Sequence, residues 1–283
     1  MTLFVDILVC ILIWFVGTAL FSFMNVIRYR YIEKKKIFNE DFTCDSCGTE
    51  LKPLEAFPVF SYLFLKGKCR YCGEKLSLYD FVNELIGGFV LVFVFLRFGD
   101  GCGISSGFIL SEPIDSIVHF NLENFAYVVT AILFVCLLDL VVMVDHKTME
   151  IPNIFVISTL VVSVLSLITM RDVGIIEHLI GALVISVPMF VITLIVKGGF
   201  GGGDVKLSFA AGLMLGWKLA IVGFFIGLLL GGLYAIIKLS TKKIDKKAHF
   251  AFGPYLCIGY MMALICGANM LWGYLKLAAI LHG

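Results

Sequence analysis

Residues 207–237 read LSFAAGLMLGWKLAIVGFFIGLLLGGLYAII, a stretch in which Lys218 is the only charged side chain. A transmembrane helix needs roughly 20 apolar residues, so this stretch is long for one span. We predict two spans, Leu207–Gly216 and Leu219–Ile237, although the first would be only about 15 Å long and is therefore a tilted, longer or broken helix. A single span would place the lysine-rich segment that follows, at 238, 242, 243, 246 and 247, on the wrong side of the membrane.

The rest of the chain has the same apolar character. Hydrophobic residues make up 60% of the 283 residues and charged residues 15%, against about 45–50% and 25% in soluble domains. This composition excludes an ordinary soluble protein and a disordered one. It predicts an all-α polytopic membrane protein with about eight transmembrane helices. The eight candidate spans are Leu3–Val26, Phe81–Leu96, Phe125–Val144, Ile154–Met170, Leu179–Val196, Leu207–Gly216, Leu219–Ile237 and Phe250–Met270.

The uneven placement of charge orients these spans. The net charge is only +1, which gives no case for a nucleic-acid partner, yet residues 28–75 hold ten of the 22 lysines and arginines. Positive residues concentrate in cytoplasmic loops, so we expect residues 28–80 to be cytoplasmic. The loop at 98–124 has four acidic residues and no lysine or arginine, which predicts an external loop. Alternation then places 145–153, 197–206 and 238–249 on the cytoplasmic side.

Four cysteines in the basic segment form two CxxC pairs, Cys44 with Cys47 and Cys69 with Cys72. Two such pairs can complete a tetrahedral zinc site, and a glycine follows each pair, where a tight turn needs a residue that tolerates positive φ. We predict a small cytosolic domain held by structural Zn²⁺. A redox-active pair and four unrelated thiols are the alternatives. The predicted organisation is a first helix (1–27), a tetra-cysteine domain (28–80) and a membrane-embedded core (81–283).

Two aspartates lie at the predicted cytoplasmic ends of apolar stretches. Asp145 ends the third span, and Asp204 opens the sixth after five glycines within residues 198–203. A carboxylate at the membrane rim is costly and usually functional. Two carboxylates that share a proton perform aspartic proteolysis, in which one activates water and the other polarises the carbonyl. We therefore predict Asp145 and Asp204 as a catalytic pair.

Other roles for these carboxylates stay open from the residues alone. Asp145 can be an interfacial helix-end residue, and Asp204 can cap the N-terminus of the sixth helix. Asp139, six residues before Asp145 in the third span, is a rival catalytic or ion-coupling carboxylate.

Several short motifs surround these residues in a fixed order. Residues 22–26 read SFMNV and are followed by Arg30, and residues 67–72 read GKCRYC. Glu84 then falls at the start of the second span.

The C-terminal half continues the series of motifs. Asp145 precedes the Ile-Pro-Asn run at 151–153 by six residues, residues 201–206 read GGGDVK, and residues 252–254 read FGP. Over nearly its whole length the chain resembles bacterial prepilin peptidases, the type IV leader peptidase family of membrane aspartic proteases. One departure is Phe21, which stands where the family usually has glycine.

This resemblance implies an activity and a place in the cell. The protein would sit in the bacterial inner membrane with its active site facing the cytoplasm, and would remove the leader peptide from prepilins or pseudopilins of type IV pilus and secretion systems. Many members also methylate the new N-terminus with S-adenosylmethionine, a role that rests here on the resemblance alone. Substrate-binding or active-site support is implied for Gly201, Gly203, Lys206, Pro152, Asn153 and Glu84.

Two alternatives come from other functional classes. A membrane thiol oxidoreductase would use the CxxC pairs, but it would need a reactive pair near the external face. An ion-coupled transporter would use Asp139, Asp145 and Asp204, and should show internal repeats with broken helices at matching positions. The sequence shows no convincing repeat of this kind.

Overall fold

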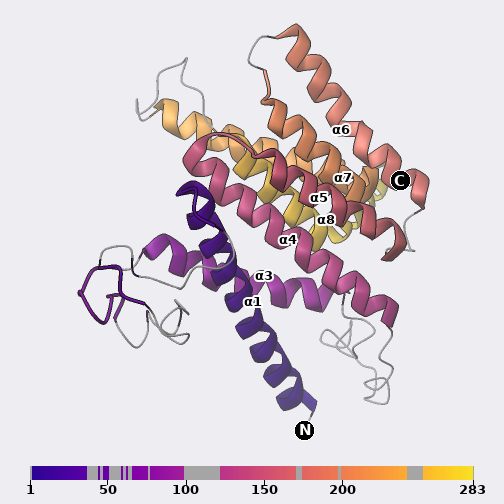
Figure 1. The fold of residues 1–283 in the computed structure, drawn as a ribbon. Helices are drawn as coiled ribbons and strands as arrows, with labels where there is room; N and C mark the ends of the chain where they lie inside the picture. Colours follow the sequence, from indigo (N-terminus) through magenta and orange to yellow (C-terminus); the bar gives the residue numbers. More distant parts are fainter. Residues whose placement is uncertain are drawn as a thin grey trace. The chain divides into compact units, whose positions relative to one another are not determined.

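The computed structural model describes residues 2–36, 44, 47–50, 59, 62, 66–75, 77–98, 122–169, 174–196, 199–240 and 251–282. Within these residues the chain is helical, with only isolated bridges such as that between Lys68 and Lys75 in place of strands (Figure 1). The helices are α1 (Thr2–Ile32), α3 (Leu78–Phe98), α4 (Leu122–Thr148), α5 (Asn153–Thr169), α6 (Ile175–Ile195), α7 (Gly202–Ser240) and α8 (Gly253–His282).

Six of these helices are long and apolar enough to cross a membrane, and α5 is a shorter apolar helix of 17 residues. The predicted all-α membrane architecture is therefore confirmed. The chain packs as two compact units, Met1–Asn121 and Leu122–Gly283. The finer division at residues 27 and 80 stays a prediction.

In the first unit, α1 packs along α3. Helix α1 ends at Ile32, six residues beyond the predicted end of its span, because polar partners on α3 support its last turns. The Nη2 atom of Arg28 lies 2.8 Å from Oδ1 of Asp80. The buried ring of Phe21 packs against Gly87, where no Cβ would fit. Gly87 therefore provides the space that the larger residue at position 21 requires.

In the second unit, α7 reverses direction within its length. Gly216 has φ 72° and ψ 165°, a conformation that essentially only glycine adopts. The half before it begins near the start of α8, where the rings of Phe200 and Phe252 lie 5.7 Å apart. The half after it returns to the same place, since a Cβ on Gly231 would meet the ring of Phe252 at 3.1 Å.

The two halves of α7 are thus antiparallel, as we predicted from the lysines that follow them. The first half, residues 202–215, has 14 residues and is about 21 Å long at 1.5 Å per residue. It packs so closely on α6 that neither Gly181 nor Gly212 leaves room for a Cβ. The reversal brings the end of α7 back to the end of the unit where Asp204 lies.

Candidate active site

Asp145 lies in the last turn of α4, and a tight turn follows it. The N–H of Met149 donates to the carbonyl of Asp145 over 2.8 Å, and Met149 has a φ of 54°. Pro152 then precedes the first residue of α5, and its carbonyl accepts the N–H groups of Phe155 and Val156. The chain therefore leaves α4 and enters α5 within a few residues, which keeps Asn153 at the same end of the unit as Asp145.

Asp204 lies in the first turn of α7. Its Oδ2 atom accepts the N–H of Gly201 over 3.3 Å, and a negative charge is favourable at a helix N-terminus. A Cβ on Gly201 would lie 3.0 Å from that oxygen, and a Cβ on Gly203 would lie 2.9 Å from Cβ of Ile151. Gly201 therefore lets the backbone before α7 pass close to the carboxylate of Asp204, and Gly203 lets the first turn of α7 approach the loop before α5.

The two carboxylates come together although 59 positions separate them in the sequence. Their residues are 3% exposed at Asp145 and 8% exposed at Asp204, and the two carboxyl groups are close enough to interact electrostatically. The N–H of Gly253, at the start of α8, donates to Asp145. A water molecule between two such carboxylates would meet a base and an acid at once.

Gly253 is the residue that the sequence reasoning missed as part of the site. A Cβ at this position would lie against Oδ2 of Asp145 and 3.0 Å from Cδ1 of Ile151. The signal in the sequence was the FGP run at 252–254. That run contributed to the family resemblance, but it gave no indication that Gly253 contacts Asp145.

The predicted supporting residues divide between the two units. Lys206 donates from Nζ to Oδ1 of Asn153 over 3.1 Å and thereby links α7 to α5. Glu84 lies in the first unit, where it is fully buried and its Oε1 accepts Nδ2 of Asn25 over 3.2 Å. Asp139, the rival carboxylate, is buried in α4. It lies about 9 Å further along the helix from Asp145.

The four cysteines form one cluster in the first unit. Their sulfur atoms all lie within 4.8 Å of one another, and those of Cys44 and Cys72 are 3.8 Å apart. A tetrahedral zinc site with bonds of about 2.3 Å has sulfur–sulfur edges of about 3.8 Å. The cluster is therefore of the right size to hold a metal ion.

Two equivalent turns present these cysteines. The N–H of Gly48 donates to the carbonyl of Cys44, and the N–H of Gly73 donates to that of Cys69. Gly48 has φ 67° and Gly73 has φ 73°, which confirms the expectation that each pair needs glycine after it.

The thiol groups of the cluster have unequal acidities. Hydrogen bonds with the side chain and backbone of Thr49 lower the pKa of Cys47 to about 6. A backbone hydrogen bond with Glu74 lowers the pKa of Cys72, but desolvation and the other three thiols outweigh it and raise that pKa to about 12. Four thiolates this close therefore need a cation to become charged together.

Two family models match the chain. The bacterial peptidase A24 N-terminal domain matches residues 15–98, and the type IV leader peptidase family matches residues 132–236. Among curated proteins, the prepilin leader peptidase/N-methyltransferase of Bacillus subtilis (strain 168) is 31% identical over 237 residues, which cover 83% of this chain and 86% of the relative. The chain belongs to the type IV leader peptidase family.

Other relatives carry the same name. The protein of that name from Vibrio cholerae is 28% identical over 89% of this chain and 94% of its own length, and that from Pseudomonas aeruginosa is 25% identical over 83% and 74%. No solved structure gives a match. The predicted family and the assignment as a peptidase are confirmed, and neither the oxidoreductase nor the transporter alternative is favoured. Asp145 and Asp204 lie within the peptidase match, and the four cysteines lie within the N-terminal match.

Proposed function

We propose that this member of the type IV leader peptidase family removes the leader peptide from type IV prepilins or pseudopilins, with Asp145 and Asp204 as its catalytic residues. The observation that carries the proposal is the burial of the two carboxylates where α4, α7 and α8 meet, close enough for their charges to interact. Burial keeps bulk water away, so that a carboxylate pair holds one proton more readily than it would in solution.

The chemistry follows from that shared proton. The ionised carboxylate takes a proton from a water molecule while the protonated one donates a hydrogen bond to the scissile carbonyl oxygen. The water oxygen bonds to the carbonyl carbon while the protonated carboxylate passes its proton to the carbonyl oxygen, which gives a tetrahedral diol. The carboxylate that took the proton from water then passes it to the leaving nitrogen as the carbon–nitrogen bond breaks, and a hydroxyl of the diol returns a proton to the other carboxylate. The N–H groups of Gly253 and Gly201 hold the two carboxylates in place during these steps.

We place the protein in the bacterial inner membrane with this site on the cytoplasmic side. The support is the distribution of lysines, since α7 ends at the same end of its unit as Asp204 and a lysine-rich stretch follows at residues 242–247. Positive residues of this kind are retained in the cytoplasm. The substrate would be a membrane-anchored precursor whose hydrophobic segment lies in the same bilayer.

We propose zinc as the metal of the cysteine cluster. Cys44, Cys47, Cys69 and Cys72 would hold it, and it would supply structural cross-linking of the two turns rather than catalysis.

Cys44→Ser is expected to remove the bound metal, because three thiolates and a hydroxyl hold zinc far more weakly than four thiolates. Metal content of the purified protein, measured by mass spectrometry, checks this. Cys266→Ser is the matched control, since Cys266 is exposed on α8 outside the cluster. Equal metal content in Cys44→Ser and the unsubstituted protein would contradict the proposed site.

We also propose methylation of the new N-terminus, on the strength of the relatives' names. S-adenosylmethionine would donate the methyl group to the amine that cleavage releases. In the described ranges there is no glycine-rich strand-to-helix turn of the kind that binds nucleotides, so no residue is assigned to this cofactor.

Incubation of the protein with a prepilin and S-adenosylmethionine tests both activities at once. We expect the precursor to lose its leader and the mature product to gain the mass of one methyl group. Mass spectrometry separates cleavage with methylation, cleavage alone and no reaction. An unchanged precursor mass would overturn the peptidase proposal, and an unmethylated product would overturn the methylation proposal alone.

A further inference from the structure

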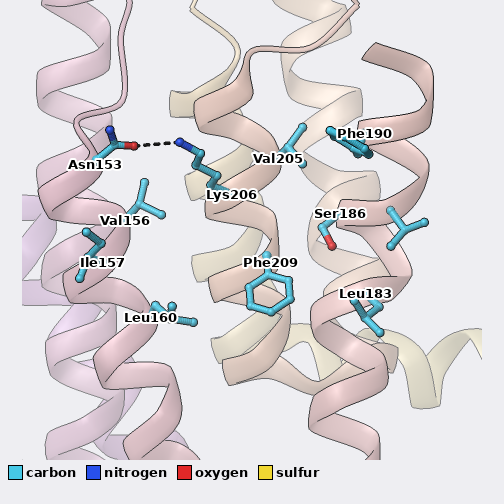
Figure 2. A pocket seen from close by; sticks show the side chains of 11 residues that line it. Asn153, Val156, Ile157, Leu160, Leu183, Ser186, Phe190, Val205, Lys206 and Phe209 are labelled. Carbon is cyan, nitrogen blue, oxygen red and sulfur yellow. Dashed lines mark hydrogen bonds between the residues drawn. The ribbon is translucent and has the colours of Figure 1, made fainter. Parts of the chain in front are cut away.

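An apolar groove lies on the outer face of the second unit, between α5 and α6 and over the first half of α7. Its cavity measures about 680 Å³, within the range of sites that bind ligands. Figure 2 shows the side chains that line it, with Ile157 and Leu160 on α5, Phe209 on α7, and Phe190 and Leu183 on α6. Lys206 is the one charged residue among those that line it.

The groove begins at the end of the unit that holds the two aspartates. On α5 its lining runs from Asn153 to Leu160, and on α6 from Phe190 to Leu183. Seven residues span about 10 Å, or two helical turns. The hydrogen bond between Lys206 and Asn153 lies at the polar end (Figure 2), and Lys206 follows Asp204 by two residues.

The long side of the groove is open. Ile157 is 58% exposed, Val187 48% and Phe190 53%, so these side chains would face lipid in a membrane. An apolar segment can therefore enter sideways from the bilayer without crossing a polar surface. Unlike the closed pocket of a small polar ligand, this shape suits a segment that is already in the membrane.

The first turn of α7 separates the polar end of the groove from Asp204. Asp204 points to the opposite face of α7 from Phe209, because five residues turn a helix through about 140°. A peptide would therefore have to pass around the first turn of α7, which begins with Gly202 and Gly203. A Cβ on Gly202 would meet nothing within 4 Å, so there is open space beside the backbone there.

We propose that this groove docks the hydrophobic segment of the substrate protein and presents the chain that precedes or follows it to Asp145 and Asp204. The inference rests on the proposed function. The occupant is a protein segment rather than a lipid tail, because the groove begins at Asn153 and Lys206, at the end of the unit that holds the two aspartates. A lipid tail does not need that position.

A photoreactive residue at position 157 tests the groove directly. Ile157 lines it, whereas Ile154, of the same type on the same helix, does not line it and is exposed to a similar extent, 54% against 58%. In membranes with an uncleaved prepilin, we expect strong cross-linking to the prepilin from position 157 and weak cross-linking from position 154. Ile154 lies closer to the catalytic end, so nearness to the aspartates alone would give the reverse order.

A bulky side chain in the groove gives a second test. Val187→Trp should raise KM for a full-length precursor several-fold and leave kcat unchanged. It should not affect a short peptide that has the cleavage site without the hydrophobic segment. Ile180→Trp is the matched control on α6, since Ile180 is 46% exposed and outside the lining.

The results separate the groove from the proposed activity. Cleavage by the unsubstituted protein together with equal cross-linking from both positions, or with lipid adducts alone at position 157, overturns the groove and leaves the peptidase intact. An unsubstituted protein that cleaves no precursor overturns the peptidase, and the groove proposal with it.

Discussion

Asp145→Asn and Asp204→Asn are each expected to abolish precursor cleavage while the protein still folds and inserts into the membrane. Asparagine keeps the shape of aspartate but cannot exchange a proton, and general acid–base catalysis contributes about 10²–10⁴-fold. In the proposed mechanism each carboxylate is needed in a different protonation state, so loss of either one would stop the reaction. Gel mobility or the mass of the precursor measures cleavage, and membrane extraction followed by chromatography checks the fold.

Asp139→Asn is the control for these two variants. Asp139 is buried in the same helix as Asp145. Its replacement by asparagine should therefore affect the stability of the fold about as much as the replacement of Asp145. We expect this variant to keep substantial activity. Full activity in either Asp145→Asn or Asp204→Asn would refute the two-aspartate assignment. An inactive Asp139→Asn beside an active Asp145→Asn would show that Asp139, and not Asp145, is the partner of Asp204.

The reversal of α7 illustrates how far charge can predict a fold. Hydropathy alone leaves residues 207–237 as one long apolar stretch. The lysines that follow decide in favour of two antiparallel helices, because five positive charges stay on the cytoplasmic side at low cost. Gly216 is one of six glycines in that stretch. Which of them would make the turn depends on contacts such as that between Gly181 and Gly212, which no local pattern encodes.

The end of α1 shows the opposite limit. Hydropathy reports where apolar side chains stop, and it placed the end of the span at Val26. The helix continues to Ile32 because Arg28 and Asn25 find partners on α3. A helix end that depends on a partner 52 positions away in the sequence, as between Arg28 and Asp80, cannot be predicted from the helix alone.

The residues of the candidate site could be proposed from the sequence, but their packing could not. The motifs around Asp145 and Asp204 point to both carboxylates and to the glycines beside Asp204 as candidates. The meeting of three helix ends at Ile151 and Gly253 comes from tertiary packing. For that reason the sequence shows Gly253 only as part of the FGP motif, and its contact with Asp145 is visible only in the folded chain.

Gly253→Ala is expected to lower kcat by about 10²-fold, because a displacement of about 1 Å in a catalytic group costs that much. The new methyl group would lie against Oδ2 of Asp145. It would displace the carboxylate and stretch the hydrogen bond from the N–H of Gly253. Alanine is a better helix former than glycine, so thermal stability should not fall with the activity. Steady-state cleavage rates and thermal unfolding in detergent measure the two effects.

Gly232→Ala provides the matched control, since a Cβ on Gly232, in the second half of α7, meets nothing within 4 Å. This variant should keep the rate of the unsubstituted protein. If Gly253→Ala loses activity and stability together, the effect is general unfolding and the contact with Asp145 is not its cause. If Gly253→Ala keeps full activity, the position of the Asp145 carboxylate does not depend on the close approach of α8. The combination expected here is a folded protein with a slow chemical step. That result would show that the absence of a side chain at Gly253 on α8 fixes the position of the Asp145 carboxylate on α4.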